Sequence, residues 1–279
     1  MIGAIVGDIA GSRFEWHNRK TKKFTLMKGR DESRHPCHFT DDSVMTLAVA
    51  DAIMKWREAG GGSYDALSAE AIMSMQEFGH RYPRAGYGGA FRRWLRDEVP
   101  QPYNSWGNGS AMRVSACGWA GRTLDEVKAM SRAVTEVTHN HPEGIKGAEA
   151  TAVATFLART GKSMEEIKAV VVRDYYPLGF TLDGIRPTYA FDVSCQGSVP
   201  QALEAFFEST SFEDAIRNAI SIGGDSDTIG AICGAVAGAY YGVPAEIRAK
   251  AEMFLDGHLL KTLHDFEQMF VSDFAGGDE

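Results

Sequence analysis

The sequence predicts an all-helical fold, and three observations support this prediction. Apolar residues recur at three-and-four spacing along most of the chain, period-two strand patterns are nearly absent, and several periodic runs begin with side chains that favour helix starts. In 42–59, Val44, Leu47 and Ala48 fall on one helical stripe. The periodicity predicts further runs at 65–80, 123–137, 143–160, 163–174, 199–208, 211–221, 227–241 and 244–271, the last as two helices.

Start signals and small residues refine these helices. Thr123 precedes an acidic turn, Ser163–Glu166 has the pattern of a capping box, and Ser211 is followed by two acidic residues. The many glycines and alanines in 229–242 indicate close packing of this helix against another one.

No linker rich in Pro, Gly or Ser divides the chain, and no repeat is visible. A chain of 279 residues can bury a substantial core. We therefore expect one domain over 1–279, with 275–279 as a frayed tail.

Composition excludes several classes of protein. The net charge of −8 disfavours a general nucleic-acid-binding face, and no stretch approaches the roughly 20 apolar residues of a membrane span. The amino terminus has no basic region and reaches Asp8 too early for a secretion signal. The cysteines form no CxxC pair, so we expect reduced thiols and a cytoplasmic protein. They are Cys37, Cys117, Cys195 and Cys233.

Three segments that contain aspartate interrupt the helical pattern. The first is 7–11, which is followed by Glu15; the others are 39–43 and 223–228, and each opens an apolar helix. Helix capping explains one acidic residue at each helix start. It does not explain two carboxylates within three positions before a buried helix, because a buried carboxylate pair is costly unless a cation neutralises it.

The possible ligands in these segments are all oxygen atoms. Carboxylates and hydroxyls suit Mg²⁺ or Mn²⁺, and less well Ca²⁺, whereas the spacing matches neither an EF-hand nor a P-loop. Zinc is a weaker alternative, since its candidate ligands match no known finger spacing. Those candidates are Cys37, His38, His139 and His141.

A turn rich in Gly, Asn and Ser spans 105–113 and leads into a helix. Its backbone N–H groups could receive a phosphate, although Asn-Gly turns are commonly only turns. The histidine-containing segment 138–142 precedes the helix at 143–160.

Seven segments carry a family resemblance. In order from residue 3 to about 244 they are GDIAGSRFE, FTDDSVMTLAVADAI, GYGGAFRRWL, WGNGSAMR, THNHPEGIKGA, SVPQALEAF and SIGGDSDTIGAICGAVAGAYYG. Together they resemble the ADP-ribosylglycohydrolase family, and TDDS, GNGSAMR and GGDSDT in this order are specific to it. The resemblance implies a compact orthogonal helical bundle with a central dinuclear site for Mg²⁺ or Mn²⁺.

The resemblance also implies roles for individual residues. Glu15 matches the glutamate beside the scissile bond, His139 the histidine on the substrate side, and Asp8 a structural position without a catalytic role. The loop that wraps the diphosphate and ribose falls on Gly107, Asn108, Gly109 and Ser110. The metal ligands fall on Thr40, Asp41, Asp42, Asp225, Asp227 and Thr228.

The function that follows is metal-dependent hydrolysis of the glycosidic bond between ADP-ribose and an acceptor, releasing ADP-ribose. Glu15 and Asp42 are the candidates for the base that activates water. An ADP-ribosylated protein side chain such as arginine is the first choice of acceptor, with serine, nucleic acid and O-acetyl-ADP-ribose as alternatives. Loops such as 16–38 and 174–198 should form the acceptor side, and we expect a monomer.

Two other functions remain open. A non-catalytic relative that binds ADP-ribose or metal is disfavoured, because every position of the ligand motifs is present. An unrelated Mg²⁺-dependent phosphohydrolase would normally bring a parallel sheet, and the sequence lacks the strands.

Overall fold

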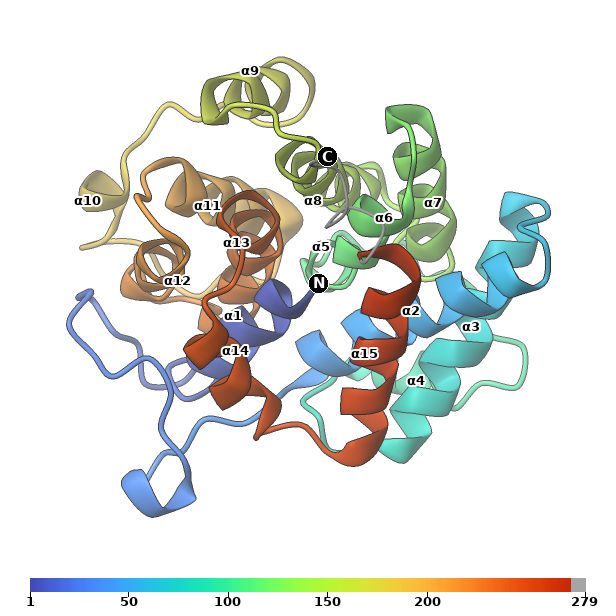
Figure 1. The fold of residues 1–279 in the computed structure, drawn as a ribbon, viewed down its shortest axis with the longest axis horizontal. Coiled ribbons are helices and arrows are strands. Elements are labelled where there is room, and N and C mark those ends of the chain that lie inside the picture. The colour runs from blue at the N-terminus through green and yellow to red at the C-terminus, as the bar shows by residue number, and fades with distance from the viewer. Residues whose placement is uncertain (272–279) are drawn as a thin grey trace, which may run out of the picture.

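The computed structural model describes residues 1–271, and this part of the chain contains fifteen α-helices and no β-strand. The helices cross one another in many directions rather than lying parallel, as Figure 1 shows. The prediction of an all-helical fold is therefore confirmed. The predicted frayed tail, 275–279, lies outside the described residues.

The predicted runs all form helices. They are α2 (Asp41–Glu58), α3 (Tyr64–Arg81), α7 (Leu124–Glu136), α8 (Pro142–Arg159), α9 (Met164–Asp174), α11 (Cys195–Phe207), α12 (Phe212–Ser221), α13 (Ser226–Tyr241), α14 (Ala245–Glu252) and α15 (Gly257–Phe270). Outside these runs lie α1 (Ile2–Ser12), α4 (Gly89–Trp94), α5 (Gly109–Met112), α6 (Ser115–Ala120), α10 (Leu182–Ile185) and the 3₁₀ turn η1 (Arg30–Glu32).

The three helix starts predicted from capping side chains are also confirmed. The hydroxyl of Thr123 accepts from the backbone N–H of Glu126 in the first turn of α7. Ser163 forms the capping box with Glu166, and Ser211 caps α12. One start was wrong: α11 begins at Cys195 rather than at 199, because the Ser194 hydroxyl caps the earlier turn.

A glycine contact between α1 and α13 sets the centre of the fold. A Cβ atom at Gly3 or Gly7 would overlap the backbone of Gly234 or Gly230 in α13, so the two backbones touch directly. The close packing predicted from the small residues of 229–242 is thus present. In Figure 1, α1 lies near the middle of the view beside α13.

This contact corrects the interpretation of segment 7–11, which was expected to interrupt the helical pattern. The segment lies inside α1. Glycine lowers helix propensity by about 1 kcal/mol relative to alanine, but here only glycine allows the backbone contact. Packing against α13 therefore overrides local propensity.

The same packing gathers distant segments. Gly11, at the end of α1, lies against the backbone of Ser226 and Asp227 at the start of α13, and α2 packs beside α1. One connected group of buried apolar residues runs from Met1 to Phe266. Within the described residues, no helix combines the length and apolar character that a membrane crossing requires.

Candidate functional site

The three acidic segments meet where α1 ends and where α2 and α13 begin. Asp8, Asp42 and Asp227 bring carboxylate oxygens within 4.8 Å of one another, and Glu15, Asp225 and Asp227 do the same. Asp227 belongs to both groups. All except Glu15 are buried, so two adjoining clusters of carboxylates lie inside the protein.

Asp8 ties α1 to the start of α2. Its carboxylate accepts from the backbone N–H of Thr40 at 2.9 Å and of Ser43 at 3.0 Å, and from both of their hydroxyl groups. Asp8 thereby accepts from two of the N–H groups that have no partner within the first turn of α2. Asp8 thus fixes how Thr40 and its neighbours approach the site, in agreement with its expected structural position, and it also belongs to one carboxylate cluster.

Helix capping does not account for the acidic residues. In α2 the cap is the Thr40 hydroxyl, which accepts from the N–H of Asp42 at 3.2 Å. Asp225 is the N-cap residue of α13, and its side chain makes no capping hydrogen bond. One oxygen of Asp42, Oδ1, is buried without a hydrogen-bond partner. A buried carboxylate oxygen with a free lone pair is what a hard divalent cation would use.

Burial and mutual repulsion raise the pKa values of these carboxyl groups. Burial, together with the nearby Asp8 and Asp41 charges, raises the pKa of Asp42 well above its usual range, and burial and Asp225 do the same for Asp227. The pKa of Asp41 rises to about 8, through burial and then Asp8. The pKa of Glu15 rises to about 7, through burial and then Asp225 and Asp8. A bound cation would favour the charged forms of all four.

A cavity of about 620 Å³ opens onto these carboxylates. Among the predicted site residues, those that line the cavity are Glu15, Thr40, Asp41, Asp42, Gly107, Asn108, Gly109, His139, Asp225, Asp227 and Thr228. Thr228 also donates from its hydroxyl to Asp42 Oδ2 at 3.2 Å, which joins the start of α13 to that of α2.

Two predicted residues are placed differently from the rest. Asp41 lines the cavity, but within the described residues it belongs to neither group of converging ligands. Ser110 does not line the cavity: its hydroxyl is buried and donates to the carbonyl of Gly144 at 2.8 Å. Through its side chain, Ser110 therefore supports the loop rather than faces a ligand.

The glycine-rich loop is held against the acidic cluster by Asn108. The Asn108 Nδ2 donates to Asp225 Oδ2 at 2.7 Å and to the Ser198 hydroxyl at 3.0 Å. Its backbone N–H donates to the carbonyl of Val193 at 2.7 Å. The loop consequently has a fixed position relative to the carboxylates and to segment 190–194.

Two aromatic residues stand at the rim of the cavity. Trp16 and Phe191 stack with ring centroids 5.2 Å apart, although 73% of Trp16 and 43% of Phe191 are exposed. They come from 16–38 and 174–198, the loops expected to form the acceptor side, and both line the cavity. The sequence did not single them out, since nothing local distinguishes a functional exposed aromatic residue from a core one.

Arg113 is a further lining residue that sequence reasoning missed. It is only 1% exposed, and its guanidinium donates to the Thr138 hydroxyl and to the Val134 carbonyl. The single available signal was its place in the motif that contains Asn108, and that motif says nothing about burial.

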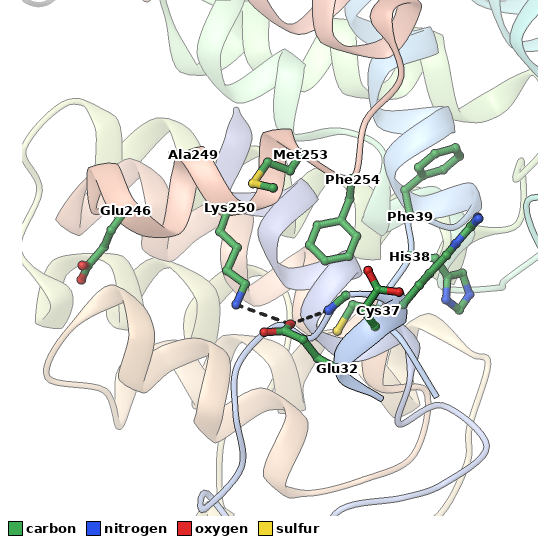
Figure 2. Close-up of a pocket in the computed structure, with 12 residues that line it drawn as sticks. Glu32, Cys37, His38, Phe39, Glu246, Ala249, Lys250, Met253 and Phe254 are labelled. Carbon is green, nitrogen blue, oxygen red and sulfur yellow. Dashed lines mark hydrogen bonds and ion pairs between the residues drawn. The ribbon is translucent and has the colours of Figure 1, made fainter. Parts of the chain in front are cut away.

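A second cavity, of about 820 Å³, lies between segment 29–39 and α14 (Figure 2). His38 lines both cavities. Figure 2 shows Lys250 and Glu32 paired at the wall of the second cavity, with Phe254 and Met253 nearby. No group of three converging metal-ligating side chains in the described residues borders this cavity, so the smaller one is the candidate site.

The zinc alternative finds no support. Among residues 1–271, no group of three converging His, Cys, Asp or Glu ligands includes Cys37, His38, His139 or His141. The four cysteines are free and buried, as expected for reduced thiols.

Known proteins resemble this chain over its length. The family described as ADP-ribosylglycohydrolase matches residues 1–274. ADP-ribosylhydrolase ARH3 of Homo sapiens is 27% identical, and the match covers 95% of this chain and 91% of that protein. ADP-ribosylarginine hydrolase Tri1 of Pseudomonas putida is 28% identical, with 87% and 70% covered.

A solved structure shares the fold. A chain of an ADP-ribosylglycohydrolase-related protein complex superposes with a TM-score of 0.66 at 24% identity, covering 95% of each chain. This likeness supports the helical architecture.

Proposed function

Since the chain belongs to the ADP-ribosylglycohydrolase family, we propose that it is a metal-dependent hydrolase that releases ADP-ribose from an ADP-ribosylated protein side chain, with arginine as the acceptor. It is a glycohydrolase, and its relatives are named as an ADP-ribosylhydrolase and an ADP-ribosylarginine hydrolase. The observation that carries the proposal is the convergence of carboxylates from α1, α2 and α13 at one cavity.

We propose that this centre holds two Mg²⁺ or Mn²⁺ ions. The proposed ligands are Thr40, Asp41, Asp42, Asp225, Asp227 and Thr228. The all-oxygen donor set and the unpartnered Asp42 Oδ1 support hard divalent cations. When bound, such ions would orient ribose hydroxyls and stabilise negative charge. The position of Asp8 makes it a further candidate ligand.

The substrate would lie along the glycine-rich loop at the cavity wall. We propose that Gly107, Asn108, Gly109 and His139 contact ADP-ribose, while Ser110 holds their loop in place. Asn108 would link the substrate-binding loop to the proposed metal centre, because its side-chain amide donates to Asp225. Fixing the ribose against the carboxylates lowers the barrier by reducing the freedom of the reacting groups.

Glu15 and Asp42 are the proposed acid–base residues. In the reaction, a water oxygen bonds to the anomeric carbon, the bond to the acceptor breaks, and the acceptor leaves with a proton. Glu15 lines the cavity beside Asp225 and Asp227, and a bound cation would keep its carboxylate charged and able to accept a proton from water. Carboxylates around the anomeric carbon would also stabilise a cationic sugar.

The rim supports arginine as the acceptor. A guanidinium group stacks favourably on an aromatic face and pairs with a carboxylate. Trp16 offers that face, and Glu15 is the adjacent residue in the chain. One of the relatives is named as an ADP-ribosylarginine hydrolase.

A panel of conjugates tests this acceptor. ADP-ribosyl-arginine, ADP-ribosyl-serine, ADP-ribosylated nucleic acid and O-acetyl-ADP-ribose are incubated with the protein and Mg²⁺, and free ADP-ribose is measured. We expect the largest kcat/KM for the arginine conjugate and a selective loss for Trp16→Ala. Faster release from another conjugate would reassign the acceptor. ADP-ribose binding without release from any conjugate would indicate a non-catalytic relative.

We also propose that residues 1–279 act as one domain, in a cytoplasmic monomer. The single connected core supports the domain assignment.

A further inference from the structure

We propose that Arg113 and Thr138 are positioning residues that hold His139 in the tautomer with its hydrogen on Nε2, so that this nitrogen donates to an anionic group of the ligand. The tautomer follows from the hydrogen bonds and the charge of Arg113, without any ligand. The ligand contact rests on the proposed function.

The two ring nitrogens of His139 face different surroundings. The Nδ1 atom lies 2.7 Å from the hydroxyl oxygen of Thr138. The Nε2 atom lies on the side of the glycine-rich loop. A Cβ atom added at Gly107 would lie 3.5 Å from Nε2, and one added at Gly109 would lie 3.6 Å from it. Only 5% of His139 is exposed, and the residue lines the cavity. A ligand at this loop would therefore meet Nε2.

The hydrogen on Thr138 decides the tautomer. A guanidinium can only donate, and the Arg113 NH2 group donates to Thr138 Oγ1 at 2.6 Å. The threonine hydroxyl has one hydrogen of its own, with two acceptors in reach: His139 Nδ1 at 2.7 Å and the Thr135 carbonyl at 3.3 Å. The second lone pair of Oγ1 could accept from Nδ1, but a hydroxyl that already accepts from a guanidinium is a weaker acceptor and a stronger donor, so its hydrogen goes to Nδ1 at the shorter contact. With Nδ1 accepting, the imidazole hydrogen must be on Nε2.

The charge of Arg113 reinforces this arrangement. Burial lowers the pKa of Arg113 to about 10, which leaves it a cation at neutral pH, and its Nε has no hydrogen-bond partner. Burial, and then the Arg113 charge, lower the pKa of His139 well below its usual range. The imidazolium form, which carries a hydrogen on both nitrogens, is therefore disfavoured. Nδ1 keeps the lone pair that accepts from the Thr138 hydroxyl.

The consequence is a fixed single donor at the glycine-rich loop. A neutral imidazole that can rotate or change tautomer would present either a donor or a lone pair to the ligand. The hydrogen bonds from Arg113 to Thr138 and from Thr138 to His139 fix the tautomer in the free protein. Such preorganisation strengthens the binding of an anion. A lone pair at the same place would repel it.

Nitrogen NMR of the full-length, ¹⁵N-histidine-labelled protein at pH 7 tests the tautomer without any ligand. The two nitrogens of a neutral imidazole have well-separated shifts, and comparison with His139→Gln assigns the residue among the eight histidines. We expect Nε2 to carry the hydrogen in the wild type and in Thr138→Ser, which keeps the hydroxyl. Thr138→Val should lose this preference. A hydrogen on Nδ1 in the wild type, or an unchanged tautomer in Thr138→Val, would overturn the assignment.

Titration of the same proteins with ADP-ribose and Mg²⁺ tests the ligand contact. Thr138→Val should weaken binding about tenfold, the effect of losing one hydrogen bond to a charged group, while Thr138→Ser should bind nearly as the wild type does. Equal affinity of Thr138→Val and wild type would overturn the contact. If the wild type showed the expected tautomer but did not bind ADP-ribose, the proposed function would fail and the tautomer would stand.

Discussion

Asp8 binds Thr40 twice, through the backbone N–H at 2.9 Å and through the hydroxyl at 2.7 Å. Asp8 lies on α1 and Thr40 is the residue that caps α2, so this contact fixes one helix relative to the other. It also places a third carboxylate beside those of Asp42 and Asp227. The fold and the site therefore share the same hydrogen bonds.

The first prediction concerns this contact. Asp8→Ala should lower the free energy of unfolding by about 1–3 kcal/mol, because it leaves buried donors of Thr40 and Ser43 without an acceptor. It should also weaken Mg²⁺ binding. Urea denaturation and metal titration measure both effects. The exposed Asp125→Ala is the control, for which we expect a change below about 0.5 kcal/mol. Wild-type stability in Asp8→Ala would show that these hydrogen bonds do not hold α2.

The second prediction concerns the glycine contact between α1 and α13. A Cβ at Gly7 would overlap the carbonyl of Gly230, which is backbone and cannot move aside. Gly7→Ala should therefore cost about 1–3 kcal/mol or more and should reduce metal binding by displacing Asp8 from Asp227. Gly179→Ala adds a Cβ in open space and serves as the control. Equal stability of the two variants would mean that the backbones do not touch.

The third prediction is a pH dependence of the metal-free protein. Raised folded-state pKa values, about 8 for Asp41 and about 7 for Glu15, mean that between about pH 4 and 8 these carboxyl groups hold more protons in the folded protein than in the unfolded chain. The free energy of unfolding should therefore fall as pH rises through this window.

Urea denaturation in EDTA at pH 5 and pH 8 checks this slope. Asp227→Asn removes one of the repelling carboxylates, so its stability should depend less on pH. A free energy of unfolding that rises from pH 5 to 8 in the wild type would contradict the burial of these groups.

The fourth prediction concerns Glu15, and it distinguishes a catalytic group from an ordinary surface carboxylate. Glu15→Gln keeps the shape and removes the charge. It should reduce kcat by about 10²–10⁴-fold, the range for general acid–base groups, with little change in ADP-ribose affinity. Glu98→Gln, at an exposed glutamate, should leave both unchanged. Near-normal kcat in Glu15→Gln would remove this residue from the reaction.

Much of the fold was predictable because helical periodicity and capping side chains are local signals. Segment 7–11 was not, because its glycines serve a contact with residues more than 200 positions away. Helix propensity predicts the wrong structure where the stabilisation from tertiary packing exceeds the cost of placing glycine in a helix.

The site was predictable to a different degree. Two carboxylates before an apolar helix pointed to Asp42 and Asp227, since burying both has a cost that only a cation relieves. Arg113 and Trp16 were missed because burial of an arginine and exposure of a tryptophan are properties of the folded chain. Ser110 shares a motif with Asn108, yet its hydroxyl turns to Gly144.

The fifth prediction concerns metal removal, and it tests the central claim most directly. The measurement is ADP-ribose release from ADP-ribosyl-arginine by the EDTA-stripped protein, before and after addition of Mg²⁺ or Mn²⁺. We expect no release without metal and full recovery with it, whereas Asp227→Ala should not recover. At about 100 times Kd the metal should also raise Tm by roughly 5–10 °C. Undiminished release by the stripped protein would contradict a metal centre between the carboxylates of α2 and α13.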